Sequence, residues 1–231
     1  MTTRIAVTAE EAADTFFLWV DQAVREVRGD WIRCFRDRLS EEQLEHIPEQ
    51  KLLDLLYAAL AMLGIAEMAD ITAVSQRARD DVSAAIYTRL AHRPIIFSYV
   101  KDFAEHGAGT RYYDRLVRDC GRIGGPWTLP IVCRVLHHLD FYEHESTASL
   151  ARDRTFLLEL GSCLLESGMN GCWRIFAGTC RISHGTKLPK PAPDQPKPAL
   201  NQKRRTAMGA VQIALAVLLA SVLAILVSSM V

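Results

Sequence analysis

The sequence predicts an all-α protein, a single helical bundle of about eight helices around a central apolar helix, followed by a C-terminal transmembrane helix. Apolar residues recur at helical spacing through most of residues 1–182, and no stretch alternates with period two for long enough to need a strand. Residues 208–231 contain no charged side chain. As a helix they would reach roughly 36 Å, enough to cross a hydrocarbon core of about 30 Å.

Helix-start signals place the first elements. Residues 8–11 (TAEE) form a capping box, which opens a helix that is expected to stop near Gly29. Residues 40–43 (SEEQ) form a second capping box over a short turn. Pro48 then begins a leucine-rich helix, because proline is well tolerated at a helix start.

Further apolar periodicity predicts helices in the rest of the domain. Pro126 and Pro130 interrupt the middle of the chain, so the central helix is expected to begin after them. The predicted helices are 70–90, 94–103, 110–118, 130–141, 146–167 and a short one at 172–182.

Composition divides the chain into a helical domain (1–182), a proline-rich and basic linker (183–205) and a tail anchor (206–231). Five prolines within residues 188–198 predict an extended, semi-rigid tether. Lys203, Arg204 and Arg205 precede the apolar tail, and basic residues stay on the cytosolic side of a membrane. A buried core helix is the alternative for the tail, but core helices rarely lack a polar face.

Charge and cysteine content exclude several classes of protein. Lys+Arg and Asp+Glu balance at 27 each, so no global field attracts nucleic acid. The six cysteines show neither a CxxC pair nor a Cys/His metal spacing, which is typical of free thiols in a reducing cytosol. His137, His138 and His144 lie close together without matching acids, and we therefore expect no metal and no cofactor.

Two short segments resemble one known family. Residues 170–176 (NGCWRIF) resemble the second homology segment, N-G-G-W-x-x-F, of the B-cell lymphoma 2 family of apoptosis regulators. That segment lies just before a linker and a membrane tail, as it does here. Some fifty residues earlier, 119–123 (DCGRI) keep the Gly-Arg-Ile of the first segment, N-W-G-R-I.

Two weaker matches have the expected order. Ile71 leads a helix on which Asp80, Asp81 and Val82 match the end of the third segment, L-x-x-x-G-D-D-Φ. Residues 28–31 (RGDW) resemble the end of the fourth segment, R-G-x-x-W. The departures from the family pattern are Ser75 for Leu, Arg79 for Gly, Glu166 for the leading Trp, Cys172 for Gly, and Gly124-Gly-Pro126 after the first segment.

The resemblance implies an anti-apoptotic, membrane-anchored regulator and not an enzyme. Its groove would bind the amphipathic helices of pro-death relatives and so block mitochondrial-type cell death. Arg122 would pair with the acidic residue of the incoming helix, and Gly121 would allow close approach of the backbone. The implied partner-binding residues are Gly121, Arg122, Ile123, Asn170, Gly171, Trp173 and Phe176, the last two also being candidates for the core.

Three other functions remain open at this point. A pro-apoptotic pore-forming effector would have the same fold, although Ser75 and Arg79 weaken export of the third-segment helix. A tail-anchored enzyme would use Cys120 or Cys133 near His137, but no orienting acid can be named. A tether is the third. The sequence leaves three further questions open. The membrane could be the mitochondrial outer membrane or the endoplasmic reticulum, the origin could be cellular or viral, and the protein could form a homo- or heterodimer.

Replacing Arg122 by alanine in the full chain is expected to weaken binding of an acidic pro-death helix by about 2–5 kcal/mol. The reason is that the partner's carboxylate would be left in the groove without its guanidinium. Titration of a fluorescent peptide measures the change. Equal affinities for the two proteins would contradict the role that the resemblance gives to Arg122.

Overall fold

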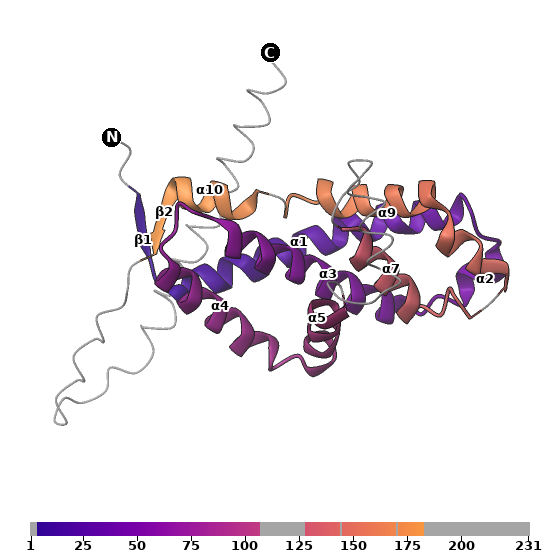
Figure 1. Ribbon diagram of the computed structural model, residues 1–231, viewed down its shortest axis with the longest axis horizontal. Coiled ribbons are helices and arrows are strands. Elements are labelled where there is room, and N and C mark those ends of the chain that lie inside the picture. Colours follow the sequence, from indigo (N-terminus) through magenta and orange to yellow (C-terminus); the bar gives the residue numbers. More distant parts are fainter. Residues whose placement is uncertain (1–3, 107–127, 144, 170, 183–231) are drawn as a thin grey trace, which may run out of the picture.

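The computed structural model of the protein describes residues 4–106, 128–143, 145–169 and 171–182, and this part is mostly helical, which confirms the predicted class (Figure 1). The predicted helix 110–118, the linker 183–205 and the tail 206–231 lie outside these residues. The elements are β1 (Ile5–Val7), α1 (Ala9–Arg36), α2 (Glu41–Glu45), α3 (Glu49–Asp70), α4 (Gln76–Leu90), α5 (Pro94–His106), α7 (Leu129–His138), α8 (Glu145–Ala148), the 3-10 helix η1 (Leu150–Arg152), α9 (Arg154–Glu166), α10 (Cys172–Thr179) and β2 (Cys180–Ile182).

Helix α1 begins at the predicted capping box. The Thr8 hydroxyl accepts a hydrogen bond from the Glu11 N–H (3.1 Å), and the Glu11 carboxylate accepts one from the Thr8 N–H (2.8 Å). The predicted stop near Gly29 is wrong, because α1 continues to Arg36. Buried Trp31 and Phe35 extend its apolar face beyond the glycine, and their burial outweighs the low helix propensity of one residue.

The central helix is α3, which packs against α1, α4, α5, α7 and α10 (Figure 1). The sequence analysis placed the central helix after Pro130, and this position is wrong: α7 is shorter and packs against α3, α5 and α9. In the part of the chain that the structure describes, Glu49–Ala69 is the one helix apolar and long enough to cross a membrane, with a mean hydropathy of 1.7. Its most apolar stretch is 61% buried inside the protein, as expected for a core helix.

The predicted helix 70–90 begins later than expected, as α4 at Gln76. Helix α3 ends at Asp70, and Ser75 caps the start of α4 by accepting a hydrogen bond from the Ala78 N–H. The Arg79 guanidinium donates to the carbonyls of Ala69 (2.7 Å) and Ile71 (2.9 Å). Arg79 therefore satisfies the open carbonyls at the C-terminal end of α3.

The predicted helix 146–167 is also interrupted. It consists of α8, η1 and α9, and Asp153 caps the start of α9 by accepting a hydrogen bond from the Thr155 N–H (2.8 Å). The predicted helix 130–141 ends earlier, at His138, shortly before Asp140 adopts a positive φ of 61°.

The structure contains a small sheet that the sequence analysis did not predict. The predicted helix 172–182 ends at Thr179, and β2 pairs in parallel with β1, with Ile5 opposite Cys180. Each strand has three residues, which is too short for a period of two to be recognised. The pairing joins the two ends of the helical domain (Figure 1).

Gly64 is the point where α3 is most closely approached by its neighbours. A Cβ atom at this position would lie 2.4 Å from Cε2 of Phe16 on α1 and 2.8 Å from Cε of Met169. Phe16 and Met169 are both buried, so they have little space into which to move. At Gly29, in contrast, a Cβ would meet nothing within 4 Å.

Gly64→Ala is expected to lower the free energy of unfolding by about 1–3 kcal/mol, because the core is overpacked. The matched control Gly29→Ala should raise it by up to about 1 kcal/mol through helix propensity. Urea unfolding of the full chain in mild detergent, followed by tryptophan fluorescence, measures both. A Gly64→Ala protein at least as stable as wild type would show that packing at Gly64 is not as tight as described.

Candidate functional site

The helix that carries the second-segment motif, α10, is held by its two aromatic residues. Trp173 and Phe176 are each 1% exposed. Trp173 stacks on Phe16 (centroids 5.7 Å apart, interplanar angle 11°), and its Nε1 donates to the Gly64 carbonyl (2.9 Å). Trp19 of α1 contacts both rings edge-on. These contacts make Trp173 and Phe176 core residues that fix α10 on α1 and α3.

A carboxylate from α3 faces the start of α10. Gly171 occupies the cap position with a left-handed φ of 92°, and it provides no capping side chain. The Glu67 Oε2 accepts a hydrogen bond from the Cys172 thiol (3.5 Å), and the carboxylate faces the backbone N–H groups of Gly171 and Trp173. Burial raises the pKa of Glu67, and these donors partly offset that effect. Glu67 thus places a carboxylate at the start of α10, whereas Asn170 lies outside the described residues.

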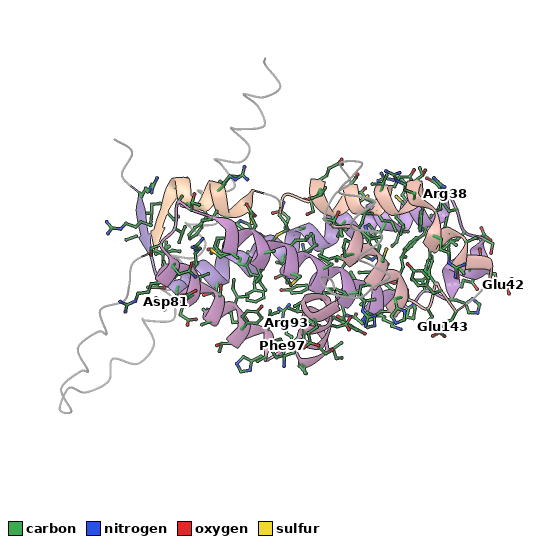
Figure 2. The ribbon with its side chains drawn as sticks, in the orientation of Figure 1. Arg38, Glu42, Asp81, Arg93, Phe97 and Glu143 are labelled. Carbon is green, nitrogen blue, oxygen red and sulfur yellow. The ribbon has the colours of Figure 1, made fainter. Side chains whose placement is uncertain are left out.

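The third-segment residues divide between core and surface. Ile71 and Val82 are buried, and Asp80 and Asp81 are exposed. Figure 2 labels Asp81 at the surface of α4. The Asp80 carboxylate accepts a hydrogen bond from the Gln76 amide (2.7 Å). The structure therefore places the apolar side of α4 in the core of this domain and its acidic side in solvent.

Ion pairs add to the attachment of α4 to α1. Arg89 contacts the carboxylates of Glu10 (2.6 Å) and Asp14 (2.9 Å) and donates to the Glu10 carbonyl (3.0 Å). One guanidinium therefore links the last turn of α4 to the first turns of α1.

A pocket of about 670 Å³ opens where α10, the start of α4 and the two strands meet. Its walls are mainly small or apolar, and Arg4 and Arg181 are its charged lining residues. The N-terminal end of α4, capped by Ser75, lies in the same wall and adds a partial positive charge. The lining consists of Arg4, Ala6, Ala73, Val74, Ser75, Ala78, Phe176, Ala177, Cys180, Arg181 and Ile182.

This pocket brings together residues that the sequence analysis treated separately. Phe176 belongs to the second segment and Ser75 to the third, and they line one cavity. Arg4 and Arg181 were not predicted from the sequence. Arg4 precedes β1 and Arg181 lies in β2, and both strands are too short to show a period of two. The sequence feature that could have indicated these two arginines is a basic residue next to a short apolar run, which occurs at each end of the domain.

A second pocket, of about 460 Å³, differs in its charges. It lies between α1, α2 and the start of α3, with Phe35 and Leu44 in its apolar floor. Its rim carries Arg28 and Arg36 but also Glu41, Glu45 and Glu49, and Arg28 is paired with Glu49. Because the rim mixes both signs, this pocket has less preference for an anionic ligand.

The histidines near Cys133 belong to a polar cluster between α5 and α7. Arg134 binds the Asp102 carboxylate through two hydrogen bonds of 2.6 Å, and His138 Nε2 lies 2.8 Å from the same carboxylate. Burial opposes ionisation of Asp102, but the bonds from Arg134 and His138 prevail and lower its pKa to about 2. Burial, reinforced by Arg134, lowers the pKa of His137.

This cluster ties α5 to α7. The Cys133 side chain beside it is fully buried, so a substrate has no access to its thiol. Within the described ranges, no three His, Cys, Asp or Glu side chains are grouped so that they could hold a metal ion. Gly121, Arg122, Ile123 and Cys120 lie outside the described residues.

Comparison of the chain with protein-family models, with curated proteins and with solved structures finds no match.

The charge on Asp102 is expected to stabilise the fold above about pH 4 and to stop doing so as the pH falls toward 2. The carboxyl binds its proton at a lower pH in the folded chain than in the unfolded one, so acid favours unfolding. Allowing for partial exposure, wild type should lose roughly 1–2 kcal/mol more than Asp102→Asn over this range. Urea unfolding at several pH values measures the difference, with Glu105→Gln on the same helix as the control. Parallel curves for wild type and Asp102→Asn would contradict this assignment.

Proposed function

We propose that this protein is an anti-apoptotic regulator similar to the B-cell lymphoma 2 family, which binds the amphipathic helices of pro-apoptotic partners. In this proposal residues 1–182 form one helical bundle, 183–205 are a linker, and 206–231 anchor the protein in the mitochondrial outer membrane or the endoplasmic reticulum. The observation that carries the proposal is the 670 Å³ apolar pocket with two arginines, at the junction of α10 and α4.

The pocket has the chemistry that one end of an amphipathic helix needs. Its volume lies within the range of about 300–1,000 Å³ common for small-ligand sites, so it would take a few side chains and not a whole helix. Apolar anchors of the partner would contact the partly exposed Val74 and Ile182, and a partner carboxylate would pair with Arg181 or Arg4. The rest of the helix would extend over residues outside the described ranges, Arg122 among them.

The attachment of α4 to the rest of the domain supports an anti-apoptotic role over that of a pore-forming effector. Exporting this helix, as a pore-forming effector would, exposes the buried residues Val82, Ile86 and Leu90. Each such side chain loses about 1.5–3 kcal/mol on exposure, and the Arg89 ion pairs add up to about 1 kcal/mol each. Burial of the three apolar side chains therefore accounts for most of the free energy that holds α4 in place. Export of α4 would also break the hydrogen bond between Arg79 and the end of α3.

Charge reversal at the pocket should weaken partner binding. Arg181→Glu is expected to reduce affinity for an acidic amphipathic pro-death helix roughly tenfold, because it replaces an attractive charge with a repulsive one. The matched control is Arg154→Glu, an exposed arginine on α9 remote from the pocket lining. Fluorescence anisotropy with the full chain in detergent micelles measures both affinities.

A charge-swapped peptide makes this test specific. A peptide with lysine in place of its acidic residue should regain affinity for Arg181→Glu and bind wild type more weakly. Absence of binding by wild type at tens of micromolar peptide would remove the proposed function. Liposome leakage caused by the protein, alone or with an activating helix, would favour the pore-forming effector instead.

A further inference from the structure

Helices α1 and α9 pack side by side in antiparallel orientation (Figure 1). The Trp31 Nε1 donates to the Leu160 carbonyl (3.2 Å), and the Phe35 ring lies 6.0 Å from that of Phe156. As residue numbers rise along α1, those of their contacts fall along α9. The register between the two helices is therefore fixed by buried contacts.

The solvent-facing edge of this interface begins with an ion pair. Arg38 donates to the Glu159 carboxylate (3.1 Å), at the end of the molecule where Figure 2 labels it. Cys34 lies four residues before Arg38, and Cys163 lies four residues after Glu159. Glu159 and Cys163 share a face of α9, and Arg38 lies in the turn that follows α1, so the antiparallel register brings Cys34 opposite Cys163 one turn along.

The two thiols are neighbours. Cys34 and Cys163 lie close enough for the side chain of each to shift the pKa of the other. Both residues are partly exposed, so a small molecule can reach them. The other three cysteines in the described ranges are Cys133, Cys172 and Cys180, and all three are buried.

We propose that Cys34 and Cys163 are a redox modification site, at which hydrogen peroxide converts the two thiols into a reversible disulfide between α1 and α9. This inference does not depend on the proposed function. It rests on the helix register that holds the two residues opposite each other, the proximity of their thiols, and their partial exposure.

The chemistry balances in two steps. The Cys34 thiolate attacks one peroxide oxygen: an S–O bond forms, the O–O bond breaks, and the departing hydroxide takes up a proton as water. The Cys163 thiolate then attacks the sulfenic sulfur of Cys34: the S–S bond forms, the S–O bond breaks, and a second water leaves. In total two thiols lose two protons and two electrons, and one peroxide becomes two waters. A small thiol reverses the reaction by exchange.

The surroundings of the pair determine which sulfur reacts first and how fast. Burial raises the pKa of both thiols, that of Cys163 to about 12. The neighbouring Cys163 side chain opposes this increase at Cys34, so Cys34 is the sulfur that loses its proton more readily. The facing carboxylates also raise one or both pKa values; they are Asp30 and Asp37 on or next to α1, and Glu159 and Glu166 on α9. The pair therefore reacts slowly at neutral pH, and faster as the pH rises.

The test is peroxide treatment of the full chain in detergent micelles. We expect the intact mass to fall by about 2 Da, and a digest without reductant to give one peptide that joins Cys34 to Cys163. Dithiothreitol should reverse both changes. The disulfide should also raise the Tm by about 4–12 °C, because it limits the unfolded chain.

Matched variants separate this pair from the other cysteines. Cys34→Ser and Cys163→Ser should each abolish the linked peptide, and Cys180→Ser should leave it unchanged. The wild-type digest decides the question even if a variant fails to fold. Separate sulfinic acids at Cys34 and Cys163, a disulfide that joins other cysteines, or two thiols that stay reduced under peroxide would overturn the proposal.

Discussion

The close contact at Gly64 is the constraint on which the rest of the domain depends. At this residue the Phe16 ring occupies the space where any other residue would have its Cβ, and the Gly64 carbonyl accepts the indole N–H of Trp173. Helices α1, α3 and α10 are therefore fixed at one point. Because α10 is held there, its far end and β2 are carried to the start of α4, where the 670 Å³ pocket forms.

Two charged side chains of this domain lie at the open ends of neighbouring helices. Arg79 binds the last carbonyls of α3, and Glu67 faces the first N–H groups of α10. Such caps typically contribute about 1 kcal/mol each, which is comparable to a strong surface ion pair. Arg4 and Arg181 differ from these residues because they line a cavity, and none of the described residues that line it is acidic.

Features that depend on residues close in the sequence could be predicted, whereas features that depend on contacts between distant elements could not. The capping boxes at Thr8 and Ser40 were predicted correctly, because each is completed within four residues. Gly29 was misread as a stop, since only contacts with distant helices show that Trp31 still faces the core. The break at 71–75 depends on Arg79 reaching back to α3, and the two strands depend on pairing between opposite ends of the domain. Arg122 of the first segment lies outside the described residues, so its role in partner binding stays a prediction.

The parallel pairing of β1 with β2 has a consequence for synthesis of the chain. Strand β1 leaves the ribosome before its partner, which follows only after some 170 further residues have been translated. Until then its backbone groups form an unpaired edge, available to other chains in the crowded cell. Contacts of such long sequence separation also slow folding, so the nascent domain must be protected until β2 emerges.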